Sequence, residues 1–497
     1  MTLGCPTEGF FPSGQGRGQV ADAVSRILNI KKAELPLALL SAAYFFCILC
    51  GYFFLRPVRE AMGVARGRGE LRWLFVGTAA VSLVFVLAFG GVVARTNRRR
   101  FIPIGYLFVI ACLIMFAGML IADGAAGGGL IGTDTETPVA RYVGYTFFVW
   151  LSTVNLFVTS VFWAFMVDIF DVRQGKRMFA FIGIGGTLGA LVGGWATNVI
   201  SGMTESVYLP AGLMLTGAAF FGMAIVLMLT LDRLALGSEY SRLTTDGAAI
   251  KGHQGAGERE PAGPIDAKMD RMIQGKIGGT FWDGAQAVAR SPYLLGIGAY
   301  IVLMAISNTL IYFTQANIIL DATDTFSELV AGFAQFDALA QVATLFVQIF
   351  VTTHVIKRIG VGWTLVILPL VTMAGFAVLS AWTVFGVMAV FQAVHRATRY
   401  AISRPARETL WSVVSPSEKY KAKPFVDVFL YRGGDVAGVG VDGAFAAMGL
   451  TLAWVAAATV PVAGVWAVLC LALGRAQQTR DVATPVSEPE REHARVG

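Results

Sequence analysis

Charged residues are scarce in this sequence. Of its 497 residues, 14% are Asp, Glu, Lys or Arg, whereas 56% are hydrophobic. A water-soluble domain carries about a quarter charged residues, so the composition excludes an ordinary soluble fold. The net charge of +7 does not indicate a nucleic-acid partner, because the basic residues stand in short loops between apolar runs, where they act as orientation signals.

Cysteine and histidine are also rare, with five and four residues. Four of the cysteines lie in apolar runs, and Cys47-x-x-Cys50 is predicted to be a pair of small buried hydrophobes rather than a redox motif. The sequence has no metal-ligand cluster, no Walker loop and no Ser-His-Asp set on a soluble scaffold. It therefore predicts no cofactor, no metal site and no enzymatic activity.

Apolar runs of about 20 residues fill most of the chain, each long enough to cross a bilayer as a helix. The alternation typical of a membrane β-barrel is missing. The sequence predicts an all-α polytopic membrane protein with about 12 transmembrane helices in two parallel six-helix halves. The expected spans lie near 35–56, 73–93, 101–122, 142–167, 178–200, 207–231, 292–317, 328–352, 363–381, 382–406, 424–446 and 448–473.

One polar segment divides the spans into two sets. It has eight Lys or Arg and eight Asp or Glu, which predicts a partly disordered linker whose last piece, Phe281–Arg290, forms an amphipathic interfacial helix. The predicted organisation is a cytoplasmic tail at 1–33, a six-helix bundle at 34–231, the cytoplasmic linker at 232–290, a second six-helix bundle at 291–474 and a tail at 475–497.

Basic residues gather in alternate loops, which places both termini in the cytoplasm. Only the first loop disagrees, because Arg66, Arg68 and Arg72 would lie outside. Each half contains a similar glycine motif: Gly185-Gly-Thr-Leu-Gly189 in span five and Gly433-Gly-Asp-Val-Ala-Gly438 in span eleven. This similarity indicates parallel repeats, and glycines four residues apart predict close helix packing.

Two short segments resemble a known family. Tyr52-Phe-Phe-Leu-Arg-Pro-Val-Arg-Glu-Ala-Met-Gly63 and Ala289-Arg-Ser-Pro-Tyr-Leu-Leu295 are similar to bacterial relatives of the ATP/ADP antiporter (nucleotide transporter) branch of the major facilitator superfamily. Arg59 and Glu60 stand where that branch has Lys or Arg and then Asp, and the turns between spans keep only the basic residues of the superfamily's motif. The resemblance implies solute transport by rocking of two halves across a bacterial inner (cytoplasmic) membrane.

In that architecture spans one, four, seven and ten line a central cavity, and polar side chains collect on these spans. We expect them to bind the substrate: Arg56, Arg59, Asn155, Asn308, Gln315, His395, Arg396 and Arg399. Arginine binds phosphate or carboxylate with a fixed fork of donors, which favours an anionic substrate. Alternatively, Arg56 and Arg59 anchor span one at the interface, Arg396 and Arg399 reach the headgroups, and His395 is a hydrogen-bonded spacer rather than a titrating group.

Spans eight and eleven add Asp337, Arg432 and Asp435 as coupling or ion-pair residues. Asp337 is either a proton carrier or the partner of an arginine, and Arg432 and Asp435 are close enough to neutralise each other. A second charged set, at the inner ends of spans four and five, is either a gate of ion pairs or a solvated loop: Asp168, Asp171, Arg173 and Arg177.

The sequence thus predicts a secondary active transporter that moves a small organic anion, a nucleotide or another phosphorylated or carboxylated solute, by alternating access. It is expected to act as a monomer in the lipid bilayer. Antiport would need no titrating carboxylate, whereas proton symport would need one. The alternative is a membrane scaffold or partner-binding module that kept the transporter fold without transport.

Overall fold

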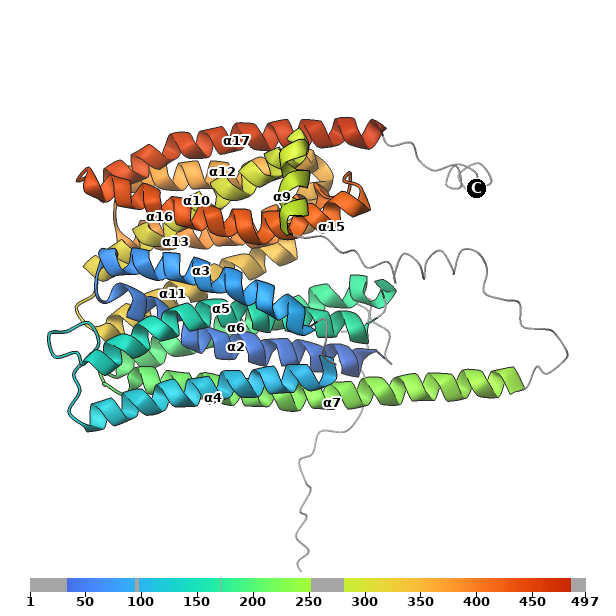
Figure 1. Cartoon of the computed structure of the whole chain (residues 1–497), viewed down its shortest axis with the longest axis horizontal. Helices are drawn as coiled ribbons and strands as arrows, with labels where there is room; N and C mark the ends of the chain where they lie inside the picture. The colour runs from blue at the N-terminus through green and yellow to red at the C-terminus, as the bar shows by residue number, and fades with distance from the viewer. Residues whose placement is uncertain (1–33, 94–97, 171, 252–280, 484–497) are drawn as a thin grey trace, which may run out of the picture.

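The computed structural model describes residues 34–93, 98–170, 172–251 and 281–483, and these are helical without any strand. Side-chain caps begin several of the helices, as in α5, where the Thr137 hydroxyl accepts from the backbone of Ala140. The helices (Figure 1) are α2 (Leu35–Val64), α3 (Arg68–Val93), α4 (Arg98–Ala125), α5 (Pro138–Ile169), α6 (Val172–Met203), α7 (Leu209–Lys251), α9 (Phe281–Arg290), α10 (Pro292–Asp321), α11 (Phe326–Phe350), α12 (Thr352–Ala381), α13 (Phe385–Ala397), α14 (Arg404–Thr409), α15 (Pro416–Pro424), α16 (Tyr431–Ala447) and α17 (Leu452–Ala483).

Nine helices in the described part of the chain are long and apolar enough to cross a membrane: α2, α4, α5, α6, α7, α10, α11, α12 and α17. The chain is therefore an all-helical, multi-pass membrane protein. The other three predicted spans coincide with α3, with the run from α13 to α14, and with the run that ends in α16. The last two of these runs are interrupted by other helical segments, and a total of twelve spans stays a prediction.

Two of the predicted spans contain π-helical turns. The segment η1 (Thr398–Ser403) separates α13 from α14, and η2 (Phe425–Leu430) precedes α16. A π-helical turn inserts an extra residue into a helix and is frequent at functional sites. Neither interruption was predicted from the sequence.

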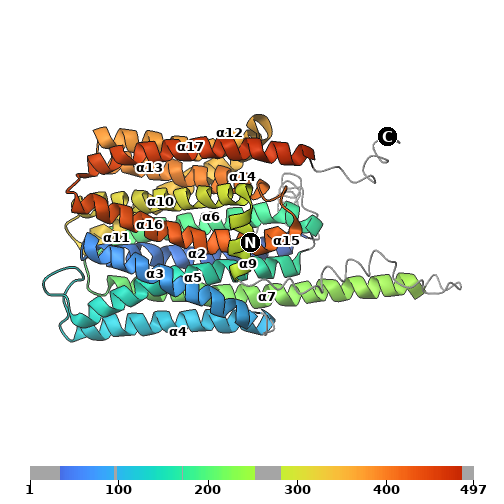
Figure 2. The same cartoon turned by 45° about the horizontal axis from the view of Figure 1, so that its top comes forward.

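Helix pairs in the first part of the bundle recur in the second. We call α2 to α7 the N-terminal group and α10 to α17 the C-terminal group. In the N-terminal group α2 packs on α6 and α7, and α4 packs on α7; in the C-terminal group α10 packs on α16 and α17, and α12 packs on α17. Figures 1 and 2 show α4 and α7 at one edge of the bundle and α12 and α17 at the opposite edge.

The glycines at spacings of four lie where these helices approach most closely. A Cβ on Gly185 or Gly193 of α6 would lie 2.6 Å from the carbonyl oxygen of Ala42 or Cys50 on α2. In the C-terminal group, a Cβ on Gly434 of α16 would lie 2.6 Å from Ala305 of α10. The structure thus bears out the prediction that the glycines of α6 serve helix packing, and it shows the same close approach at Gly434 of α16.

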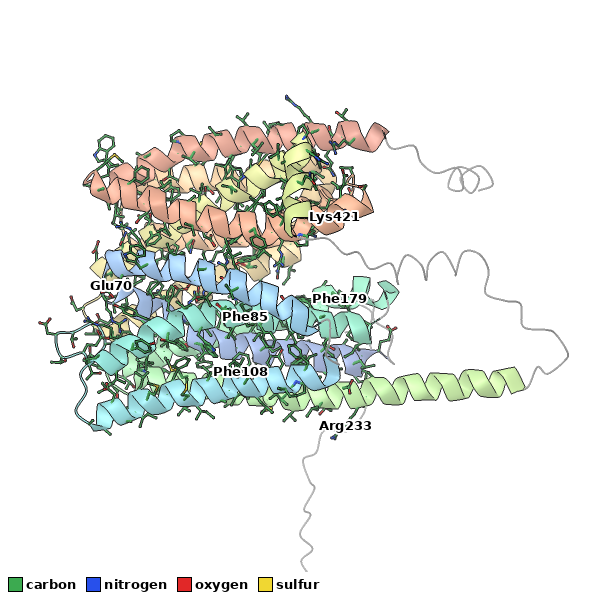
Figure 3. All side chains as sticks on the ribbon, in the orientation of Figure 1. Glu70, Phe85, Phe108, Phe179, Arg233 and Lys421 are labelled. Carbon is green, nitrogen blue, oxygen red and sulfur yellow. The ribbon has the colours of Figure 1, made fainter. Side chains whose placement is uncertain are left out.

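The two groups meet along α6 and α11 and along α3 and α16, while α11 also contacts α2. Figure 3 places Glu70, near the start of α3, at one end of the bundle, and Lys421 beside α9 toward the other end. We refer to the end at which α2 ends and α3 begins as the α2–α3 end.

Basic residues of the first loop have buried acidic partners at this end. Arg66 donates from Nε to both carboxylate oxygens of Glu136, at 3.1 and 3.0 Å, and its guanidinium lies 4.8 Å from the centre of the Tyr145 ring. Arg72 donates from Nε to Asp442 Oδ2 of α16 at 2.9 Å. Because these charges are neutralised within the bundle, they carry little weight as orientation signals.

The helix α7 continues well past residue 231, where the sequence predicted the end of span six. It runs to Lys251, so the first part of the predicted linker is helical. The segment from 232 to 251 contains no proline and is rich in Leu, Ala and Arg, which favour helix continuation. The predicted amphipathic helix at Phe281–Arg290 is present as α9, which crosses the ends of the long helices (Figure 1) and packs on α15 and α10.

Candidate substrate-binding site

Charged side chains from three helices converge between the two groups. Nη1 of Arg56, on α2, lies 3.0 Å from Oδ1 of Asp337 on α11. Arg396, on α13, donates from Nη1 to the same oxygen. Asp337 is 2% exposed, so a single buried carboxylate holds two arginines that come from opposite groups. Of the two roles weighed for Asp337, the structure shows the contacts of an arginine partner.

Glu60 is a second buried carboxylate in this cluster. It accepts a hydrogen bond from Arg59 and another from the hydroxyl of Tyr312, on α10 of the C-terminal group. Nε of Arg56 lies 3.5 Å from its Oε1. Glu60 lies in the motif of the first span but was not predicted as a site residue, although an acidic group four residues after Arg56 in an apolar span was a usable signal.

The arginines of α2 also pack on aromatic rings. The guanidinium of Arg56 lies 5.5 Å from the centre of the Phe53 ring, and that of Arg59 lies 5.4 Å from the centre of the Phe148 ring. Nη1 of Arg59 donates to Ser152 on α5 at 3.1 Å. With side chains 17% and 13% exposed, Arg56 and Arg59 are held inside the bundle, which disfavours their reading as interfacial anchors.

The cluster carries an excess of positive charge. Arg56, Arg59 and Arg396 supply three charges and the carboxylates of Asp337 and Glu60 remove two, which leaves one positive charge. Because the helices around it are apolar, water screens this charge less than at a protein surface. The cluster therefore attracts an anion rather than a cation.

A second cationic group lies further along the span that contains Arg396. Arg399, in η1, donates from Nη2 to the hydroxyl of Tyr431 at 2.8 Å. Its guanidinium lies 5.4 Å from the ring centre of Tyr400 and 6.0 Å from that of Tyr431. Arg399 has aromatic and hydroxyl partners here, and no carboxylate pairs with it in the described residues.

Arg432 and Asp435 neutralise each other, as their spacing on α16 suggested. Nη1 of Arg432 lies 3.0 Å from Oδ2 of Asp435, and the Thr309 hydroxyl of α10 donates to Oδ1 at 3.5 Å. This pair contributes no net charge to the site.

Uncharged predicted residues are distributed on α5, α10 and α13. Gln315 is buried and accepts a hydrogen bond of 2.6 Å from Nε2 of Gln392. His395 is buried, with its ring centre 5.9 Å from that of Phe391. Asn155 and Asn308 are half-buried, and neither hydrogen-bonds to the charged cluster within the described part of the chain.

Several polar atoms around the site are buried without a partner among the described residues: Oδ2 of Asp337, Nε of Arg59, Nε2 of His395, Oε1 of Gln392 and Nδ2 of Asn308. Leaving such a group unsatisfied costs about 1–3 kcal/mol. They lie on the helices that carry the charged cluster and its neighbours, which indicates a region suited to binding a polar solute. The expected gate is not described: Asp171 lies outside the described residues, as do the side chains of Asp168, Arg173 and Arg177.

Comparison with known proteins agrees with this arrangement, although no family model matches the chain. ADP,ATP carrier protein 1 of Chlamydia pneumoniae is 22% identical over 468 residues, which cover 82% of this chain and 83% of that protein. ADP,ATP carrier protein 1 of Chlamydia trachomatis is 22% identical over 452 residues, covering 82% and 80%.

Solved structures show the same fold. A mutant of the nucleoside transporter NupG superposes with a TM-score of 0.55 at 15% sequence identity, covering 89% of this chain and 99% of that one. A second NupG structure gives a TM-score of 0.51, with coverage of 90% and 99%.

The chain is thus a multi-pass membrane protein that resembles carriers in sequence and has the fold of solved transporters. The chain is a distant relative of the chlamydial carriers, so the resemblance to the nucleotide-transporter branch of the major facilitator superfamily, expected from two short segments, extends over most of its length.

Proposed function

We propose that the chain is a secondary active transporter that exchanges small organic anions across the membrane by alternating access. The observation that carries this proposal is the meeting of Arg56 and Arg396, from opposite helix groups, at one buried carboxylate of Asp337. Guanidinium groups bind phosphate and carboxylate with two parallel hydrogen bonds, so an anion that enters between the groups can replace Asp337 as their partner.

The net positive charge supports antiport. In the empty carrier, Asp337 and Glu60 neutralise two of three arginines; an anionic substrate would take over this role and release the contacts between groups. Without a substrate these contacts would persist, and the carrier would reorient slowly between its two open states. Transport of one anion inward would therefore depend on transport of another anion outward. Proton symport through Asp337 is the competing scheme and predicts accumulation driven by a pH gradient.

Contacts at the α2–α3 end support alternating access. Arg72 of α3 is paired with Asp442 of α16, and the Phe75 ring of α3 packs with its centre 4.9 Å from that of Tyr312 and 5.2 Å from that of Phe313, on α10. These contacts join the two groups at one end of the bundle. Transport would require them to separate while contacts form at the other end.

The proposal also covers the orientation of the protein in the membrane and its division into domains. With cytoplasmic termini, the α2–α3 end faces outward, and the structure corresponds to a carrier closed on that side. We propose a bacterial inner-membrane protein that acts as a monomer in the bilayer, with six-helix halves at 34–231 and 291–474 joined by the linker at 232–290.

Nucleotides are the proposed substrate class. The distant relatives are ADP,ATP carriers, and a phosphate chain offers enough anionic oxygens for several arginines at once. Other phosphorylated or carboxylated solutes satisfy the same chemistry with fewer contacts.

A thermal-shift screen of the purified protein tests the proposal. A ligand that binds only the folded state stabilises it, by about 2.7 kcal/mol at one hundred times its dissociation constant. We expect nucleotides to raise the melting temperature of the wild type and of Arg141→Ala, a control whose arginine is 55% exposed and away from the site, but not of Arg396→Ala. Stabilisation by neutral solutes alone would refute an anion carrier, and the absence of stabilisation by any solute would favour the scaffold alternative.

A further inference from the structure

Tyr400 is an accessible aromatic residue in the middle of a predicted span. It is 44% exposed, although the next three residues, Ala401, Ile402 and Ser403, are 2%, 6% and 1% exposed. It lies in the π-helical segment η1, and π-helical turns are frequent at functional sites.

Tyr400 lies on the same side of its helix as the charged cluster. Tyr400 follows Arg396 by one helical turn, whereas Val390 and Val394, which are 66% and 44% exposed, lie on another face of the same run. The guanidinium of Arg399, the next cation along this span after Arg396, lies 5.4 Å from the centre of the Tyr400 ring. The accessible ring of Tyr400 therefore lies beside the cationic groups of this span.

Other rings that contact the arginines of the site are less exposed than Tyr400. Phe53 and Phe148, under Arg56 and Arg59, are 6% and 3% exposed. Tyr431 accepts the hydrogen bond of Arg399 and is half-buried. Tyr400 combines a neighbouring guanidinium, 5.4 Å from its ring centre, with an accessible surface.

We propose that Tyr400 is a specificity-determining residue on which the planar ring of an aromatic anion stacks, while Arg399 and Arg396 hold the anionic groups of the same molecule. This inference rests on the proposed function and narrows it to anions that carry an aromatic ring. A nucleobase stacks on any aromatic face because every base has a π-surface, and one stacked base contributes about 1–3 kcal/mol in other proteins, roughly 5- to 150-fold in affinity.

The test compares ATP with inorganic triphosphate, which has the charged groups without the ring. Dissociation constants of both are measured by ligand competition on the full-length purified protein. We expect the wild type to bind ATP at least about tenfold more tightly than triphosphate. Tyr400→Leu should abolish this preference and leave triphosphate affinity within about twofold, whereas Tyr400→Phe and Tyr400→Trp should keep the preference. Tyr208→Leu, which removes a tyrosine that is 45% exposed in the turn just before α7, serves as the matched control.

The outcomes separate this inference from the proposed function. If Tyr400→Leu weakens both ligands equally, or neither, Tyr400 is not a stacking surface. If the wild type binds triphosphate and ATP alike, the anion site stands and the ring subsite is refuted. If the wild type binds neither, the proposed function fails as well. Should Tyr400→Leu not fold, the ratio of ATP to triphosphate affinity in Tyr400→Trp decides: a ratio at or above that of the wild type supports stacking, and a ratio near one refutes it.

Discussion

Arg56 and Asp337 join the two helix groups through an ion pair of 3.0 Å between Nη1 and Oδ1, and Arg396 binds the same oxygen from within the C-terminal group. The chain positions of these residues are far apart, so only the folded protein brings them together. The contact has two consequences: it holds the groups against each other, and it occupies arginines that an anionic solute would otherwise bind.

Removal of the Asp337 charge should destabilise the substrate-free protein. Asp337→Asn leaves Arg56 and Arg396 facing each other with less counter-charge, and breaking a buried ion pair by removing one partner costs about 3–5 kcal/mol. We expect a clearly lower melting temperature in the absence of ligand, and partial recovery when nucleotide is added. Asp134→Asn, at an exposed loop position, should melt like the wild type.

A double substitution distinguishes pairing from general damage. If Arg396 and Asp337 interact as the structure shows, Arg396→Gln with Asp337→Asn should be less destabilised than the sum of the single variants. Additive effects would mean that the contact does not contribute to stability, and the displacement of Asp337 by substrate would lose its basis.

The pair formed by Arg72 and Asp442 should influence transport more than folding. Their side chains are 23% and 11% exposed, and a partly exposed ion pair contributes about 1 kcal/mol or less. Arg72→Asp should slow exchange about fivefold or more through repulsion, and the charge-reversed combination of Arg72→Asp with Asp442→Arg should recover much of the rate. Exchange rates of the wild type and of both variants are measured in proteoliposomes. If the charge-reversed variant does not recover the exchange rate, this contact is not part of the closed end.

Gly185 should be intolerant of a larger side chain. Gly185→Val would place its Cβ 2.6 Å from the Ala42 carbonyl oxygen, which is backbone of α2 and cannot move freely. Overpacking of this kind costs about 1–3 kcal/mol, so a lower melting temperature is expected. Gly183→Val on the same helix is the control, because no atom lies within 4 Å of a Cβ there. Equal effects of both variants would indicate a loss of helix propensity only.

The sequence predicted the parts of the fold that depend on local composition. The lengths of the apolar runs located α2, α4 and α10, and the glycine spacing predicted a close helix contact of α6, whose partner the structure identifies as α2. It also singled out Arg56, Arg396 and Asp337, because charge in an apolar run is costly and therefore informative.

The sequence could not predict contacts between residues that are distant along the chain. Glu60 matters because Tyr312 reaches it from the other group, and Arg72 contradicted the orientation rule until Asp442 was placed beside it. The π-helical turn around Tyr400 leaves no compositional trace, since it arises from how the helix fits its neighbours. Tyr400 was therefore not predicted as a site residue.

The measurement that tests the central claim most directly is counter-exchange in proteoliposomes loaded with ADP, with radiolabelled ATP outside. The account predicts uptake that requires internal ADP, persists without a pH gradient, and falls by about 10- to 100-fold in Arg396→Ala, the equivalent of losing one hydrogen bond to a charged group, while Arg141→Ala retains the wild-type rate. Undiminished uptake by Arg396→Ala, or wild-type uptake of neutral solutes in place of anions, would contradict a carrier built around these arginines.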